Sequence, residues 1–227
     1  MIELLRRPGA FIHDIATKRV MKRFVERFRF VYFGRVDPRS AEHQLVRGLT
    51  VSADHVDNHY AVGAFRGHDI TLVERYARLR YPGKADQDYR WIIMQVDLKR
   101  QGLPHFFVDG HHHEEVFFAN MFVKFGNFEN ANRLFLLHDR MFLRYFKVFA
   151  PPDFFDEVAD VLRPEVTAML GHHFRQFDYE IDDDRLLVYA SNAAMTPRLL
   201  PEMMRVGLWL ADHINAQHMA GPVVDKE

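Results

Sequence analysis

The sequence contains no cysteine, and no hydrophobic run in it approaches the length needed to cross a bilayer. The absence of cysteine excludes a disulfide framework, a thiol nucleophile and thiolate metal ligands, and it fits a reducing cytoplasm. The first residues also lack the apolar centre and the small-residue cleavage site of a signal peptide. These absences predict a soluble protein of the cytoplasm.

An excess of charge of one sign is also absent. The chain has 30 Lys and Arg residues against 31 Asp and Glu residues, which gives a net charge of -1. Nothing in this balance favours nucleic acid, so we expect no nucleic-acid partner, and any basic site must be local. The sequence lacks a G-x-S-x-G elbow, a phosphate-binding glycine loop and a dinucleotide fingerprint. We therefore predict no catalytic residue and no cofactor.

What the chain does contain is apolar and aromatic. Its 227 residues are 48% hydrophobic and include 21 phenylalanines, enough for an aromatic core in one large domain. We expect a single domain over residues 11–216, with tails at 1–10 and 217–227. The loop at 126–133 is the best candidate for a joint between subdomains, because glycine and asparagine interrupt the pattern there.

Residues 142–191 organise the rest of the chain, and we read them as strand, helix, strand and strand. Apolar residues on both faces predict a central strand over 142–149. Asp153 is placed to cap the helix that follows, and Pro164 to begin a second helix that Gly171 ends. A hairpin then follows, with strands at 177–182 and 186–190 and a turn at Asp183–Asp184.

The remaining pattern favours strands before this stretch and a helix at each end of the chain. Strand composition occurs at 30–33, 48–52, 60–65, 70–76, 90–98 and 105–108. Helical spacing occurs at 17–28 and again from Leu199 to about Asn215. The predicted fold is α+β: a mainly antiparallel sheet, in one piece or in two halves. It has an N-terminal helix, a helical crossover after Pro152 and a C-terminal helix.

The N-terminal helix at 17–28 is basic and amphipathic. Val20, Phe24 and Phe28 share one face, and Arg and Lys residues dominate the other. Such a helix can lie on an anionic membrane or bind a partner, so residues 17–28 are a candidate peripheral membrane contact. The simpler interpretation, which we favour, is that the apolar face packs on the protein's own domain.

The histidines are the strongest chemical candidates. His111, His113 and Glu114 belong to a tract of three histidines and two glutamates whose side chains suit a transition metal. Adjacent histidines do not converge easily on one ion, which favours a solvated turn. Convergence of distant histidines, for example His105, His113 and His138, would instead indicate a metal-dependent hydrolase.

Two further groups have simple structural interpretations. His55 and His59 are four residues apart, but the glutamate that a metalloprotease places after the first histidine is missing, which favours a polar loop. Asp182, Asp183 and Asp184 lack the spacing and glycine of a calcium loop, which favours a turn between strands.

The order of several motifs resembles an uncharacterised family of bacterial proteins, a domain of unknown function. The motif residues are Phe142, Phe146, Val148, Asp153, Leu162-Arg163-Pro164, Tyr179-Glu180-Ile181 and Leu187-Val188-Tyr189, with Arg66-Gly67-His68, the strand at 91–98 and Leu103-Pro104-His105 upstream. The resemblance runs from about Phe24 to Asn215. Many relatives have acidic or amide residues where this chain has Met141 and Leu143. The family has no established activity, so the resemblance implies a conserved fold and transfers no catalytic residue.

Together these observations favour a non-enzymatic interaction module of the cytoplasm that acts near the membrane and binds a protein partner. The alternative is a metal-dependent hydrolase that uses histidine ligands.

Overall fold

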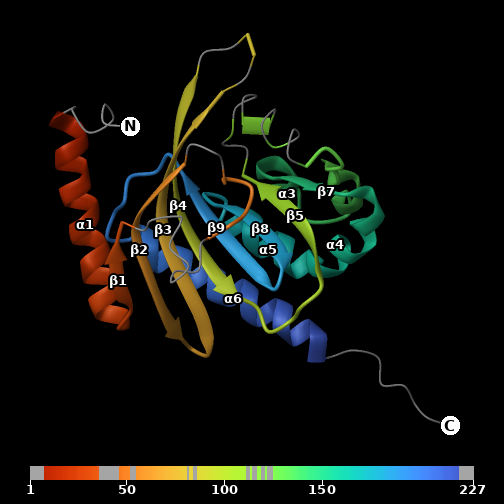
Figure 1. The fold of residues 1–227 in the computed structure, drawn as a ribbon. Coiled ribbons are helices and arrows are strands. Elements are labelled where there is room, and N and C mark those ends of the chain that lie inside the picture. The colour runs from red at the N-terminus through yellow and green to blue at the C-terminus, as the bar shows by residue number, and fades with distance from the viewer. Residues whose placement is uncertain are drawn as a thin grey trace.

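The computed structural model describes residues 8–35, 46–51, 55–80, 82–83, 86–110, 113, 117–118, 121 and 125–219. Its centre is one nine-stranded sheet, in which every pair of neighbouring strands is antiparallel (Figure 1). The strands are β1 (Val31–Gly34), β2 (Val56–Phe65), β3 (His68–Leu79), β4 (Gln87–Asp97), β5 (Leu103–Asp109), β6 (Glu129–Asn130), β7 (Lys147–Ala150), β8 (Asp178–Asp183) and β9 (Arg185–Ser191). Their order across the sheet is β1-β2-β3-β4-β9-β8-β5-β7-β6.

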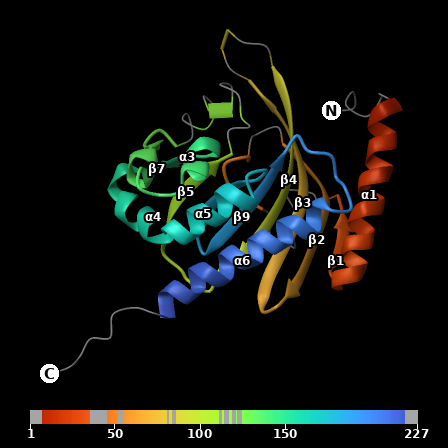
Figure 2. The same cartoon turned by 180° about the vertical axis from the view of Figure 1, so that it is seen from behind.

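Helices cover one face of this sheet. They are α1 (Pro8–Phe28), α3 (Arg140–Tyr145), α4 (Phe155–Val161), α5 (Pro164–His173) and α6 (Leu199–Met219), with short 3-10 turns at Asn132–Phe135 and Pro152–Phe154. Figure 2 shows α6 crossing in front of the sheet, with α1 beside β1 and β2 at one edge and α3, α4 and α5 near the other. No helix among the described residues is long and apolar enough to span a membrane.

Alternation along the strands separates two cores. On β4, Ile92 and Met94 face the helices, whereas Trp91 and Ile93 face the opposite side. The second core is closed by residues from connecting segments, which include Val46, Leu49, Phe117, Met121 and Phe128. The five helices therefore cover one face of the sheet, and on the other face residues from connecting segments complete the core.

The expected fold class is confirmed, with a helix near each end of the chain and a helical crossover after Pro152. The sheet is one piece and not two halves. The segment 126–133 contributes β6, which pairs with β7 at the edge of the same sheet.

The expected strand over 142–149 is wrong in its first half. Residues Arg140–Tyr145 form α3, and only Lys147–Ala150 is a strand. The Asp139 side chain caps α3 by accepting a hydrogen bond from the Met141 N–H at 2.7 Å. The apolar residues of this stretch fit both the alternation of a strand and the spacing of a helix. Phe142 and Phe146 lie four residues apart, and their rings stack on each other at the C-terminal end of α3.

Two further local predictions are wrong. Asp153 lies inside a 3-10 turn, and α4 begins at Phe155 without a side-chain cap. Gly171 does not end α5, which continues to His173. A Cβ atom at Gly171 would lie 2.6 Å from the backbone nitrogen of Phe142, so this glycine allows α3 and α5 to cross closely.

The predicted strand at 48–52 is also wrong. Residues 48–50 form a bend and a turn, in which the Val51 N–H donates to the Gly48 carbonyl at 3.2 Å. The predicted turn at the end of β8 is confirmed: Asp183 has a φ of +60°, and its carboxylate accepts from the Gly102 N–H at 2.7 Å.

Candidate functional site

Buried polar side chains gather on the face of the sheet away from the helices. Asp109 ends β5, Asp178 begins β8 and Ser191 ends β9, and antiparallel pairing brings these strand ends together. Asp109 and Asp178 are 0% and 1% exposed. Two buried carboxylates this close must be compensated by hydrogen bonds or positive charge.

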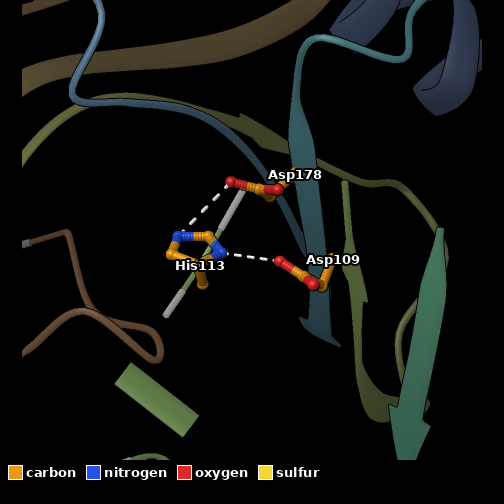
Figure 3. A group of neighbouring side chains, drawn as sticks. All are labelled: Asp109, His113 and Asp178. Carbon is orange, nitrogen blue, oxygen red and sulfur yellow. Dashed lines mark hydrogen bonds and ion pairs between the residues drawn. The ribbon is translucent and has the colours of Figure 1, made fainter. Parts of the chain in front are cut away.

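His113 supplies the compensation (Figure 3). Its Nδ1 lies 2.6 Å from Asp109 Oδ1, and its Nε2 lies 3.0 Å from Ser191 Oγ and 3.6 Å from Asp178 Oδ2. The ring stacks on Phe117 with centroids 3.9 Å apart. The side chain is 1% exposed, so the expected solvated turn is wrong for His113.

Asp178 is held by two further contacts. Its Oδ1 accepts from the Gly110 N–H at 2.8 Å, and its Oδ2 accepts from the Ser191 hydroxyl at 2.9 Å. The Oδ2 atom of Asp109 is buried and has no hydrogen-bond partner among the described residues. The cluster therefore joins the ends of three strands to the segment that contains His113.

The charges in this cluster depend on one another. Burial works against a charged imidazole, but Asp178 and Asp109 together outweigh it and raise the pKa of His113 above its ordinary value. Burial raises the pKa of Asp178, and the Asp109 charge adds to the rise although His113 opposes it. His113 is therefore favoured in its protonated form, as an imidazolium between two carboxyl groups.

We expect the protein to lose stability as the pH rises above about 6.5, the ordinary pKa of histidine. A group whose pKa is raised by folding stabilises fully below its unfolded pKa, and this stabilisation is lost as the pH rises through the folded pKa. The raised pKa of Asp178 acts in the same direction, from the ordinary pKa of an aspartate upward. Denaturation midpoints in urea, measured from about pH 6 to pH 9, should fall less steeply for His113→Gln than for the wild type.

His173→Gln is the matched control, because it removes an exposed imidazole of α5 and should keep the wild-type slope. Equal slopes for the wild type and His113→Gln would show that His113 does not carry a stabilising charge.

Asp109, His113 and Asp178 could also ligate a metal ion. One ligand atom from each of them lies within 4.8 Å of the other two. Asp109 approaches Nδ1 of His113, and Asp178 approaches Nε2 of the same ring. One ion can use only one of these two nitrogens. In the structure a carboxyl group faces each nitrogen, an arrangement that suits a protonated imidazole.

The other predicted metal and histidine residues are placed elsewhere. His111 and Glu114 lie outside the described residues. His105 Nε2 lies 2.7 Å from Glu180 Oε1, and His138 Nδ1 lies 2.9 Å from Thr167 Oγ1. Since His105, His113 and His138 each contact different partners, the convergence that a metal-dependent hydrolase requires is not seen among them.

The H-x-x-x-H pair lies on β2 and its approach, so it is not in the expected polar loop. His59 sits at a bulge of the strand with a φ of +54°, is 4% exposed, and its Nδ1 lies 2.7 Å from the Tyr32 hydroxyl. His55 Nε2 lies 3.9 Å from Asp57 Oδ2. The two histidines have separate surroundings and do not form a pair of ligands.

The distances from Ser191 to His113 and from His113 to Asp109 also match those of a nucleophile, base and orienting acid. The positions of the protons differ from those in such a catalytic group. A protonated His113 donates to Ser191, and the Ser191 hydroxyl donates to Asp178. In this protonation state no basic nitrogen faces the Ser191 hydroxyl.

A second buried network lies on the same face. Arg75 is 0% exposed and donates from Nε and Nη2 to both oxygens of Asp57, each at 2.7 Å. Arg75 Nη1 also donates to Thr50 Oγ1 at 2.9 Å. Glu180 accepts from the Leu49 N–H at 2.9 Å and from the Tyr189 hydroxyl. These bonds hold the segment 46–51 against the sheet.

The N-terminal helix forms the second candidate region, and it packs on the domain as we favoured. Met21 and Phe24 of α1 are 0% and 5% exposed. Phe24 meets Phe30 edge to face at 5.8 Å, and Phe28 meets Phe65 at 5.2 Å. The apolar stripe of α1 is therefore used inside the protein and is not available to a lipid bilayer.

The opposite side of α1 is a cationic surface. Its exposed basic residues, which we call the α1 basic face, are Lys18, Arg19, Lys22, Arg23 and Arg27. Several of them, with Ile15 and Glu26, line an open hollow along the helix. None of the five forms an ion pair with a residue whose side chain the structure describes, and Glu26 is the one acidic residue in the hollow.

Sequence reasoning found His113 and the basic helix but missed the partners of His113 and the whole Arg75 network. The sequence did contain a pattern that indicates buried charges. Arg75 alternates with Val73 and Ala77, and Asp109 alternates with Phe107, so each charge occupies a core-facing position of a strand. A charged residue at such a position needs a buried partner, and only the fold shows which residue it is.

No family model and no curated protein matches this chain. Among solved structures, the chain is similar to the crystal structure of the mycobacterial trehalose monomycolate transport factor A, TtfA. The TM-score is 0.58 at 11% sequence identity, and the match covers 92% of this chain and 98% of that one. At this identity the likeness shows a shared fold alone.

Proposed function

We propose that this protein is a non-enzymatic interaction module that binds an acidic surface of a protein partner through the α1 basic face. The module acts in an accessory role near a membrane. This role is one of recognition: the chain supplies a rigid platform, and the chemistry of the process belongs to other proteins.

The proposal rests on the different environments of the two faces of α1. The helix buries Met21, Phe24 and Val25 against its own domain and presents its cations to solvent. Cations fixed on a rigid helix suit a carboxylate-rich surface, because complementary charge speeds encounter and fixes orientation. A bilayer contact through residues 17–28 would have to rely on charge alone, which leaves such binding shallow and sensitive to salt.

The structural neighbour supports the accessory role. That protein is described as a transport factor, and its fold covers nearly the whole of this chain. A transport-related role near a membrane agrees with an interaction module better than with a hydrolase. A cytoplasmic location is part of the same proposal, and so is membership of the uncharacterised bacterial family.

We expect the double variant Lys22→Glu, Arg23→Glu to lose the partner. Both side chains are exposed, so the fold and the melting temperature should be unchanged. Reversing two charges of the α1 basic face turns attraction to an acidic surface into repulsion. Binding of the partner should therefore weaken at least about tenfold. The measurement is capture of partner proteins from native cells by the tagged full chain at low and moderate salt.

The control is Arg47→Glu, Arg163→Glu, which reverses two exposed cations outside α1, one in the segment 46–51 and one between α4 and α5. It should capture the same partner as the wild type. Equal capture by the α1 variant and the wild type would contradict a role for the α1 basic face.

A further inference from the structure

The exposed cations of α1 lie in two rows along the helix. Arg19, Arg23 and Arg27 follow one another at intervals of four residues, and Lys18 and Lys22 form a second row beside them. Residues four apart are neighbours on one face of a helix and are separated by about 6 Å along its axis. The α1 basic face therefore consists of two ridges that run along the helix.

The hollow that these rows line has different chemistry at its two ends. It begins at Ile15, whose side chain is 46% exposed, and ends at Glu26, and cations of both rows line its middle. The other acidic residue in the sequence of α1 is Asp14. A ligand that matches the hollow along its length is therefore apolar beside Ile15, acidic in the middle and basic beside Glu26.

Carboxylates of the neighbouring elements do not neutralise the α1 basic face. The strand β1 contains no acidic residue. Asp57 of β2 and Glu74 of β3 are 3% and 1% exposed, and each lies within 4.0 Å of an arginine. Glu202 in the first turn of α6 comes one turn after the exposed Arg198. Among the described residues near α1, cations therefore outnumber exposed carboxylates.

The backbone of α1 favours a helical occupant over an extended one. The N–H and C=O groups in the middle of a helix are already hydrogen-bonded to one another, so α1 offers none of them to an extended chain. An extended segment on this surface would have to leave its own backbone groups to water, whereas a helix satisfies them internally. Ridges of one helix also pack into the grooves of another, with the axes about 8–10 Å apart.

We propose that the occupant of the α1 basic face is an acidic α-helix of the partner protein, which lies along the hollow. Its carboxylates recur at steps of three or four residues and face the cations in the middle of the hollow. An apolar side chain contacts Ile15, and a lysine or arginine pairs with Glu26. The helices are antiparallel, because each helix end then lies beside an end of opposite partial charge. This inference rests on the proposed function and adds the shape and the charge pattern of the partner.

The test uses the full chain and a dye-labelled, alanine-rich helical peptide whose side chains follow this order. After a first Lys, the peptide has Glu at the third, fourth, seventh and eighth following positions and Leu at the eleventh, so that Lys faces Glu26 and Leu faces Ile15. We expect fluorescence anisotropy at low salt to show binding about tenfold tighter than that of a peptide with the same composition in scrambled order.

Two controls separate shape and order from total charge. A proline in the middle of the peptide keeps the charges but breaks the helix, and it should weaken binding about tenfold. The variant Glu26→Lys changes an exposed side chain and should keep the wild-type melting temperature. It should prefer a peptide in which the first Lys is replaced by Glu, whereas the wild type should prefer the original peptide.

Equal binding of the helical and proline-containing peptides would overturn the helical occupant, and no binding of the ordered peptide would overturn it as well. An unchanged preference in Glu26→Lys would overturn the assigned direction. The proposed function survives each of these results if the Lys22, Arg23 variant still fails to capture the partner from cells. Stronger binding to vesicles of equal parts phosphatidylcholine and phosphatidylserine than to the peptide would assign the surface to a membrane and contradict both.

Discussion

Replacing Arg75 by methionine should destabilise the protein by about 3–5 kcal/mol, the range for breaking a buried ion pair by removing one partner. Arg75 is fully buried, and Asp57 lies with both carboxylate oxygens at 2.7 Å from its guanidinium. Methionine fills similar space but leaves Asp57 charged and without compensation. It also removes the donors that hold Thr50 Oγ1 and the Val46 carbonyl.

Urea denaturation of the purified variant measures this loss, which is a large part of the stability of a typical domain. The double variant Arg75→Met, Asp57→Leu is the control. Since it removes both charges, it should recover most of the stability that the single variant loses. A single variant as stable as the wild type would show that the pair is solvated and that the segment 46–51 is held by other contacts.

Phe146→Ala should also cost about 3–5 kcal/mol, the range for deleting a buried aromatic side chain. Phe146 is 0% exposed and lies between the end of α3 and the start of β7. Its ring stacks on Phe142 with centroids 5.1 Å apart and lies 6.2 Å from the ring of Tyr179 on β8. Alanine would leave a cavity where helix and sheet meet.

The exposed Leu137 provides the control for Phe146→Ala. Leu137→Ala removes a large apolar side chain that makes little contact with the protein, so its denaturation midpoint should stay close to that of the wild type. An unchanged midpoint for Phe146→Ala would mean that the packing of α3 on the sheet is not as the structure has it.

The fold class could be predicted because most of its elements have one dominant period. The strand β4 alternates clearly between residues of the two cores, and α6 keeps helical spacing over Leu199, Leu200, Met203 and Met204. Antiparallel neighbours also follow from short connections such as the turn between β8 and β9. The position of β5 between β8 and β7 could not be read in the same way, because it depends on contacts between distant residues.

Residues 140–149 show why a local pattern can mislead. Apolar residues occupy seven of the ten positions there, so alternation and helical spacing are both satisfied. The outcome was decided by Asp139, whose side chain caps a helix, and by Gly171, whose missing side chain makes room for that helix. Both residues act through tertiary contacts that a pattern of hydrophobicity does not contain.

The histidine cluster illustrates the same limit at the candidate site. The tract around His113 was recognisable by composition, but its sequence neighbours are not its partners. Asp109 comes from the end of β5, and Asp178 and Ser191 come from strands more than 60 residues later in the chain. Only the sheet order brings these strand ends together, and that order turns an apparently solvated tract into a buried charge cluster.

We propose that the α1 basic face, beside the β1 edge of the sheet, binds a partner protein. The buried networks around His113 and Arg75 hold connecting segments to the sheet.

Site-specific photo-crosslinking from α1 in native cells tests the central claim most directly. A crosslinking amino acid placed at Lys22, on the exposed side of the helix, should capture a protein with an acidic surface. The same group placed at Arg163, which is exposed between α4 and α5 near the opposite edge of the sheet, should not capture it. Identical products from both positions, or capture from Arg163 alone, would contradict the proposal that the α1 basic face is the binding surface.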